Sequence, residues 1–489
     1  MKKIFLFLTI SLFSIPAMYA VVTWDGTASE AWTKGTGTEA DPYLIETPAH
    51  LAYLSAQVKA GNTYEGVRFL QTDDLNLNSK TWTSIGTSTY KFAGVYDGGE
   101  KYISNLTNSI FGYVNNSNIQ NLTLQGADII ISDPKAYASL VNYAYGDCRI
   151  SNCHNHIHFK TTSEIYRSSS FTIHCGGLIA KAECSSILIE NCSNSGNIGY
   201  EYSFSGTYTK ETCGYAGGII SEATNATIIR CFNTGSISAK LRGHYQNSDD
   251  QIQNVAAAGI IGRGTDNICN QCYNTGIISA YGSGDGSSNR NVYACGIGNC
   301  KLIQACYVVC TLSSSGTAAS GSQFHAYSFG EGTIESCYAL TNGGFPKAVS
   351  NVYHNSSTST VGTYKSDIAF KSPSMIPLLN TIDEYFTMDL EGINDGYPIL
   401  KWQAGPRYTI TGSCDANRGT VKGGGEYAPG STVTLTATPK KGCTFVGWSD
   451  GNTDNPRTVT VEGDATYRAQ FIKSNYTIYV NQDCTSYIE

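Results

Sequence analysis

A repeat of roughly forty residues constrains this chain more than any other feature of its sequence. The word Ile-x-x-Cys-x-Asn-x-Gly-x-Ile recurs, and its cysteines are separated by 39, 39, 41, 34 and 31 residues. A second word, written GGLIA, GGIIS, AGIIG and CGIG, precedes several of the copies. Similarity at such a period predicts a stacked architecture in which each unit buries its apolar face against its neighbours. The repeat cysteines are Cys153, Cys192, Cys231, Cys272, Cys306 and Cys337, and Leu122 takes the same slot in an earlier copy.

The repeat units have the composition of strands. Ile, Val, Thr and Tyr dominate them, Gly, Asn and Ser punctuate them, and no apolar stripe of helical period runs through them. We therefore expect a β-solenoid in which each unit makes two coils of about 20 residues, stacked about 4.8 Å apart. Because equivalent residues stack, the repeated cysteine and asparagine should point into the core, with glycine at turns. Ile229 and Ile260 are assigned to that core, and His156 to the surface.

The start of the chain indicates export. Residues 1–20, MKKIFLFLTISLFSIPAMYA, place two lysines before an apolar run and end in small residues, which is typical of a secretory signal peptide. We expect a mature chain from about Val21, at the cell surface or outside the cell. No later stretch reaches the roughly eighteen apolar residues of a membrane span. The net charge of −7 is mild for 489 residues, and no basic stripe is present, which argues against nucleic acid as a partner.

Several words resemble a known family. GG-[LI]-I followed by I-x-x-C-x-N-x-G-x-I resembles the Glug motif of bacterial surface and secreted proteins, and the resemblance implies a right-handed parallel β-helix. By this resemblance, residues 21–110 form the N-terminal cap and first coils, with ETPAHLAYLSAQV as a capping helix, and residues 111–345 form the repeats. Residues 346–405 would close the solenoid, with SPSMIPLLNTIDEYF as a helix and NDGYPILKWQ as a strand. Caps are needed because an open solenoid end is an exposed sheet edge.

The composition changes after Gly405. Residues 406–472, with Gly419-Thr-Val, GSTVTLTATP, FVGWSDG and a final Ala-x-Phe, are similar to divergent B-repeat modules of internalin type, which are small β-grasp-like domains. Residues 473–489 resemble the start of a second copy, which is too short to fold alone. We expect them to be either a truncated module or a disordered tail. The predicted fold class is therefore all-β: a parallel β-helix with short capping helices, then a B-repeat-like domain. Both resemblances imply attachment or adhesion at a cell surface.

Three histidines next to a repeat cysteine are candidate metal ligands. In Cys153-His-Asn-His-Ile-His158, the register turns Cys153 inward and His154, His156 and His158 outward on one strand. Histidines two apart on a strand share a face and can chelate a metal ion. The equivalent residues of later repeats supply no ligand, and no acidic partner orients the rings. We therefore interpret this face as a solvated strand and expect neither metal nor cofactor.

The cysteines are interpreted as packing residues. Cys269 and Cys272 match a short redox or zinc pattern, but Cys272 is the repeat cysteine and Cys269 takes the slot of Ile228 and Ile189. Parallel stacked side chains suit disulfide torsions poorly, so we expect mostly free, buried thiols. Pairing of Cys414 with Cys443 stays open.

No committed active site is visible, so no catalytic residue is assigned. Glu183 and Glu222 both lie nine residues before their repeat cysteine, and Arg263 takes that place in the next unit. This alignment makes a charged ladder conceivable, although a solvated surface position is favoured. Phosphate loops, zinc-protease helices and nucleophile elbows are absent from the sequence.

Tyrosine supplies the remaining functional signal. The chain has 33 tyrosines, and a segment rich in them, residues 200–215, is expected to form an exposed loop suited to binding. The sequence is best explained by an exported, monomeric, non-catalytic adhesin-like protein that binds extracellular glycans or surface proteins through loops on a β-helix. Two alternatives stay open: a β-helix enzyme acting on polysaccharide, and a structural stalk without a ligand.

Overall fold

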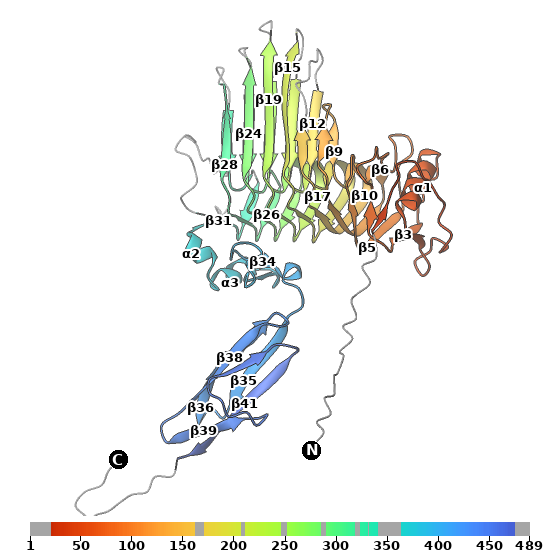
Figure 1. Ribbon diagram of the computed structural model, residues 1–489. Helices are drawn as coiled ribbons and strands as arrows, with labels where there is room; N and C mark the ends of the chain where they lie inside the picture. Colours follow the sequence, from red (N-terminus) through yellow and green to blue (C-terminus); the bar gives the residue numbers. More distant parts are fainter. Residues whose placement is uncertain are drawn as a thin grey trace, which may run out of the picture. The chain divides into compact units, whose positions relative to one another are not determined.

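The computed structural model describes residues 21–161, 171–206, 211–245, 252–284, 290–317, 323–330, 332–340 and 363–474 (Figure 1). The predicted signal peptide, most of the predicted tail and residues 346–362 of the predicted closing segment lie outside these ranges. The chain divides into two compact units, residues 1–385 and residues 386–489. The first unit is a parallel β-helix, and the second contains a small β domain.

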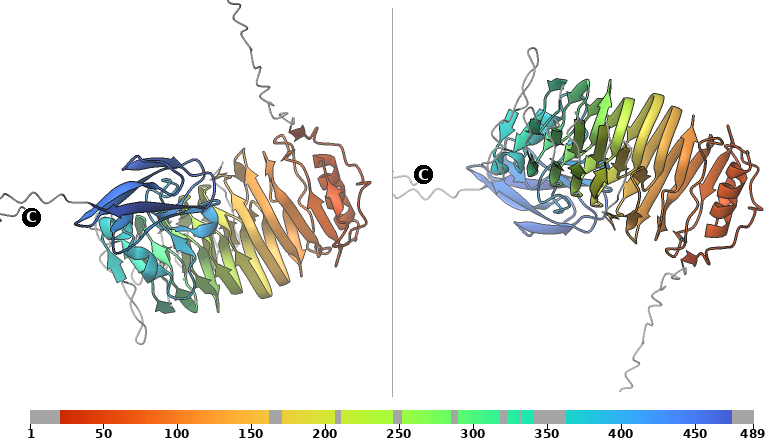
Figure 2. Two further views of the ribbon diagram at one scale, coloured as in Figure 1. Left: turned by 90° about the horizontal axis from the view of Figure 1, so that it is seen from below. Right: turned by 90° about the horizontal axis from the view of Figure 1, so that it is seen from above.

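Parallel strands of a 20-stranded sheet form the body of the β-helix, and Figure 2 shows their coils stacked in a row. Each repeat makes one coil, because the partner of Asn155 across the sheet is Asn194, 39 residues away. The expectation of two coils per unit was therefore wrong. The strands of this sheet are β1 (Val22–Thr23), β2 (Tyr43–Ile45), β3 (Arg68–Gln71), β4 (Leu75–Asn76), β5 (Val95–Ser104), β6 (Phe111–Asn115), β7 (Asn118–Gln125), β10 (Val141–Asn155), β13 (Ile179–Glu190), β14 (Ser193–Asn194), β17 (Ile220–Ile229), β18 (Phe232–Asn233), β21 (Ile261–Thr265), β22 (Ile268–Asn270), β23 (Tyr273–Asn274), β26 (Leu302–Gln304), β27 (Tyr307–Val308), β30 (Thr333–Glu335), β31 (Tyr338–Leu340) and β32 (Thr363–Lys365).

The residues of each repeat that lie outside the 20-stranded sheet form two further parallel sheets, which project from the coil. We call this two-layered extension the fin; its tall strands are labelled at the top of Figure 1. The strands of the two sheets pack face to face and enclose small and apolar side chains such as Ala239, Leu241 and Val255. One fin sheet contains β9 (Ala136–Ala138), β12 (Phe171–Gly176), β16 (Glu211–Gly217), β20 (Ile252–Ala258), β25 (Arg290–Cys295) and β29 (Gln323–Tyr327), and the other contains β15 (Ile198–Gly206), β19 (Ile237–Tyr245), β24 (Ile278–Gly284) and β28 (Leu312–Gly316). The short strands β8 (Ile129–Ile131) and β11 (Phe159–Thr161) pair separately.

The repeated asparagine holds the coils together from inside. The side-chain amide of Asn155 donates to Asn194 Oδ1 at 2.7 Å, Asn194 donates to Asn233 at 2.6 Å, and Asn233 donates to Asn274 at 2.7 Å. Each of these asparagines is fully buried. The glycine two residues later is needed because a Cβ at Gly235 would lie 2.0 Å from a carbonyl oxygen of the preceding coil. The motif N-x-G therefore reflects two requirements: an asparagine for the buried amide ladder, and a glycine where the backbones of adjacent coils approach closely.

The adjacent interior row consists of the repeat cysteines. Cys153 is fully buried and lies in register with Leu122 of the preceding coil, as the sequence predicts. Ile228 and Ile260 are also fully buried, whereas Ile229 is half-buried on the outer face. The inward assignment of Ile229 was therefore wrong by one position, and such a slip exchanges the two faces of a strand.

Helices cover parts of the solenoid. The predicted capping helix forms as α1 (Pro48–Lys59), whose first turn is capped by the Thr47 hydroxyl, and it buries Leu51, Leu54 and Val58 in the core of the first coils. Near the other end lie the short helices α2 (Asp367–Phe370) and α3 (Met375–Leu379). Phe370 contacts Tyr307, which belongs to a stacked outer row that includes Phe232 and Tyr273.

The second unit begins with a strand pair, β33 (Phe386–Thr387) and β34 (Ile399–Leu400), and a 3-10 turn, η1 (Lys401–Gln403). The β domain that follows packs two sheets around Trp448, Leu435 and Ile410. Its first and last strands pair in parallel, and no helix occurs among residues 406–474. One sheet contains β35 (Tyr408–Cys414), β37 (Gly425–Tyr427), β39 (Cys443–Trp448) and β41 (Ala465–Lys473), and the other contains β36 (Gly419–Lys422), β38 (Thr432–Pro439) and β40 (Arg457–Thr460).

Candidate ligand-binding groove

A groove follows the corner where the fin meets the coil. One wall is the outer face of the fin sheet that contains β12, β16, β20, β25 and β29, and the other wall is formed by β13, β17 and β21 of the coil. The groove contains two hollows, of about 210 Å³ and about 520 Å³, and both are lined by Tyr215 and Arg263. A ligand lying along the corner would therefore cross several coils.

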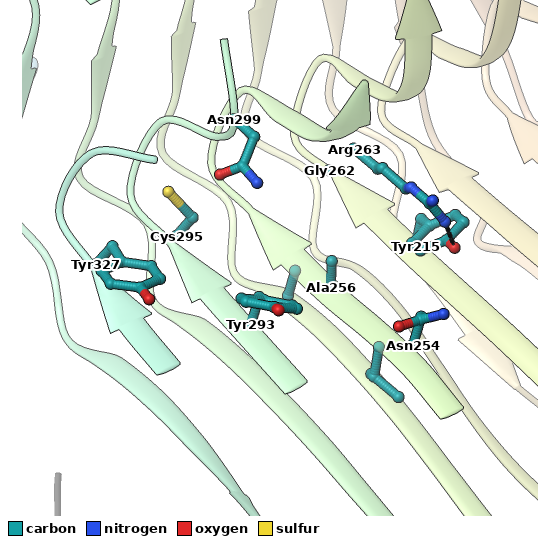
Figure 3. Close-up of a pocket in the computed structure, with 11 residues that line it drawn as sticks. Tyr215, Asn254, Ala256, Gly262, Arg263, Tyr293, Cys295, Asn299 and Tyr327 are labelled. Atoms are coloured by element: carbon teal, nitrogen blue, oxygen red, sulfur yellow. Dashed lines mark hydrogen bonds between the residues drawn. The ribbon is translucent and has the colours of Figure 1, made fainter. Parts of the chain in front are cut away.

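The smaller hollow is a slot over Ala256 (Figure 3). In the register of the fin sheet, Ala256 lies between Tyr215 and Tyr293, so a small side chain separates two aromatic ones. The facing wall includes Gly262, where a Cβ would lie 2.7 Å from the carbonyl oxygen of Ala216, so the two walls approach closely there. The remaining lining includes the ring of Tyr327, the amides of Asn254 and Asn299, and the small side chains of Ala257 and Cys295. Slots with apolar ring faces and a few polar groups are typical of small-molecule sites.

The larger hollow lies beside a charged corner, which we define as Lys181, Glu222, Arg263 and His174. Lys181, Glu222 and Arg263 occupy the same position on three successive strands, so one carboxylate stands between two cations. His174 approaches from the fin sheet, with its Nδ1 3.2 Å from Glu222 Oε2. The Arg263 guanidinium donates to the Tyr215 hydroxyl and lies over that ring at 4.9 Å.

Burial and neighbouring charge shift the pKa values in this corner. Burial, together with the positive charges of Lys181 and Arg263, lowers the pKa of His174 to about 3, so the imidazole is neutral at physiological pH. Burial raises the pKa of Glu222, although the positive charge of Lys181 opposes the shift. His174 Nδ1 has no hydrogen-bond partner among the described residues, so the contact with Glu222 is one of distance only, and each group is able to exchange a proton with a bound ligand.

The charged ladder suggested by the sequence exists, but with one different member. Lys181, not Glu183, lies beside Glu222, and Glu183 instead forms an ion pair with Lys181 at 2.6 Å. The register of β13 shifts after Glu183, and the irregularity adds two residues between the ladder and Cys192. Counting back from the cysteine therefore selected the wrong residue in this unit, while Glu222 and Arg263 were placed correctly.

The sequence did not identify His174 or the tyrosines of the slot. Residues 200–215 were expected to form an exposed loop, but they belong largely to strands β15 and β16, and residues 207–210 lie outside the described ranges. Tyr200 and Tyr202 are buried. Tyr215 and Cys213 of this segment line the groove, and Arg263 lies over the Tyr215 ring. The signal that could have found the site is a fin position that carries a ring in His174, Tyr215, Tyr293 and His325 but a small residue in Ala256.

The outward histidines of β10 are held by serines of the next coil. The Nδ1 atoms of His154 and His156 lie 2.9 Å and 2.5 Å from the hydroxyls of Ser193 and Ser195. Burial lowers the pKa of both rings. In the part of the chain that the structure describes, no group of three or more His, Cys, Asp and Glu side chains is arranged to hold a metal ion.

The described cysteines are free thiols. Cys269 lies in register with Ile228, as its slot in the repeat predicts, and its sulfur is 3.3 Å from that of Cys300. Cys414 and Cys443 are unpaired in the β domain. Burial raises the pKa of the Cys231 thiol, which further lowers its reactivity.

A family model of the divergent InlB B-repeat domain matches residues 408–475. This segment is therefore similar to the divergent InlB B-repeat domain. Its β strands agree with the resemblance seen in the sequence. No curated protein matches the chain.

Two solved structures resemble the chain. One is a candidate immunoglobulin A1 protease from Bacteroides ovatus, with a TM-score of 0.43, 17% identity, and coverage of 76% of this chain and 95% of the other. The second is described as an IgA1 protease, with a TM-score of 0.39, 15% identity, and coverage of 69% of this chain and 24% of the other. Within the described residues, no helix is long and apolar enough to cross a membrane.

Proposed function

We propose that the chain is an exported, adhesin-like surface protein that binds an extracellular glycan in the groove between fin and coil. The observation that carries this proposal is the slot over Ala256, which Tyr215 and Tyr293 flank and which amide side chains line. Sugar rings have apolar faces and a rim of hydroxyls, so they suit a site of ring faces and planar amides. The B-repeat domain supports display at a surface only through the family resemblance.

A rigid groove of this kind binds by adding modest contacts over several coils. Its strands are fixed by parallel pairing on both sides, so little order has to be gained on binding. The slot of about 210 Å³ joins a hollow of about 520 Å³ along the corner, and this narrow path suits a slender chain of sugar rings. The geometry therefore favours a glycan chain over a folded protein surface.

A glycan array with the chain lacking residues 1–20 tests the proposal, together with two variants. Ala256→Tyr adds a third ring to the row and fills the slot without removing any lining group, so it should abolish binding. Tyr90→Ala is the control, because Tyr90 is an exposed tyrosine remote from the groove. Equal binding by all three proteins, or no binding of any glycan by the unaltered chain, would refute the proposal.

Cleavage of polysaccharide is a second candidate, and the pair of His174 and Glu222 in the larger hollow favours it. The pair could transfer a proton to or from a bound sugar. The same incubations should therefore be assayed for new reducing ends and for unsaturated sugar products. Product that disappears in Glu222→Gln would establish the enzyme, and absence of product with retained binding would leave a binding protein.

A further inference from the structure

The charged corner indicates which kind of glycan the groove accepts, an inference that rests on the proposed function. The corner opens on the hollow of about 520 Å³, whose lining includes Lys181, Glu222, Arg263 and His174. At neutral pH His174 carries no charge, so two cations face one carboxyl group. Glu183 pairs with Lys181 at 2.6 Å, so the charges balance while Glu222 is ionised, and the corner becomes positive when Glu222 is protonated.

Arg263 is the group best placed to hold an anion. Among the described residues, no carboxylate lies within ion-pair distance of its guanidinium, and its hydrogen bond goes to the neutral hydroxyl of Tyr215. A guanidinium offers five N–H donors in a planar fork that matches a carboxylate or a sulfate. Stacking on the Tyr215 ring fixes the plane of that fork at the junction of the two hollows.

We propose that the groove binds an acidic glycan, with one anionic substituent on Arg263 and Lys181 and the adjoining sugar ring in the slot over Ala256. Uronic acid carboxylates and sulfate esters share this chemistry. Because Arg263 and Tyr215 line both hollows, a ring in the slot has its substituents within reach of the corner. The Arg263 guanidinium then determines the direction and register of the glycan chain, and the tyrosines hold its rings.

Glu222 makes the affinity depend on pH. Its ionised form competes with the ligand for Lys181 and Arg263, and burial raises its pKa. A bound anion favours the protonated carboxyl, so a proton is taken up on binding and the affinity rises as the pH falls. The other titratable or charged groups around Glu222 are Lys181, Glu183, Arg263, His174, Tyr215 and Cys213.

The experiment is calorimetric titration of the chain lacking residues 1–20 with three oligosaccharides of equal length: an oligogalacturonate, a sulfated neutral oligosaccharide, and the same neutral oligosaccharide without sulfate. Arg263→Gln is the test variant. Arg242→Gln is a matched control, because Arg242 also lies over a tyrosine ring at 4.9 Å but pairs with Glu201 on the other fin sheet. Thermal melting establishes that both variants fold.

We expect at least one acidic oligosaccharide to bind tenfold or more tightly than the neutral one, and Arg263→Gln to remove that difference while Arg242→Gln keeps it. Comparison of the oligogalacturonate with the sulfated oligosaccharide identifies whether the bound substituent is a carboxylate or a sulfate. Tight binding of the neutral oligosaccharide that Arg263→Gln leaves unchanged would overturn the acidic ligand but keep the glycan groove. Failure of all three to bind, with the array also negative, would overturn both.

Discussion

Replacing Asn233 with alanine tests the amide ladder, which we regard as the main reason for the repeated asparagine. Asn233 accepts from Asn194 at 2.6 Å and donates to Asn274 at 2.7 Å and to the carbonyl oxygen of Gly235 at 2.8 Å. The substitution removes three buried hydrogen bonds and leaves Asn274 Oδ1 without its donor. At about 1 to 1.5 kcal/mol for each bond, the free energy of unfolding should fall by about 3 to 5 kcal/mol.

Asn197→Ala is the control for this experiment. Asn197 belongs to the preceding repeat but is exposed, and its side-chain oxygen accepts one hydrogen bond, from the Ser236 amide at 3.0 Å. Its loss should cost about 1 kcal/mol or less. Urea unfolding followed by circular dichroism measures both variants. Destabilisation of Asn233→Ala by no more than the control would refute the view that the ladder stabilises the stacked coils.

Three further predictions concern the interior and the groove. Ile228→Asp should destabilise the fold by several kcal/mol, whereas Ile229→Asp should change thermal melting little, because only Ile228 points into the core; equal melting would contradict the register. His174 has a folded-state pKa of about 3, below its unfolded value, so its contribution to stability is complete above about pH 6.5 and is lost as the pH falls toward 3. Stability measured between pH 6 and 4 should therefore fall less steeply in His174→Gln, by up to about 1.4 kcal/mol per pH unit, and unchanged slopes would show that the imidazole is not buried neutral. Cys231 and the other repeat thiols should react with a thiol reagent only after unfolding; rapid reaction of the folded protein would place them outside the core.

The sequence predicted the stacked architecture because each coil places the same residue types in contact with those of the coils above and below. Asn233 and Gly235 are required by contacts with identical residues above and below, so the pattern survives in the sequence. The residues per coil were not predictable in the same way. A period of 39 residues fits two short coils or one coil with a fin, and the sequence pattern does not separate them, since a fin strand such as β19 alternates apolar or small residues with polar ones as a coil strand does.

The groove was predicted only in part, because it depends on register between distant strands. Glu222 and Arg263 were found by counting from the cysteine, but an irregularity in β13 displaced Lys181 from that count. His174 and Tyr293 come from fin strands whose position relative to the coil is set by tertiary packing. No local pattern reports that two sheets meet at a corner.

A crystal structure of the chain soaked with the tightest-binding oligosaccharide tests the central claim most directly. The account predicts a sugar ring over Ala256 between Tyr215 and Tyr293, with its anionic substituent on Arg263. An empty groove with the ligand bound elsewhere would contradict it, for example on the fin sheet of β15, β19, β24 and β28 or on the B-repeat-like domain.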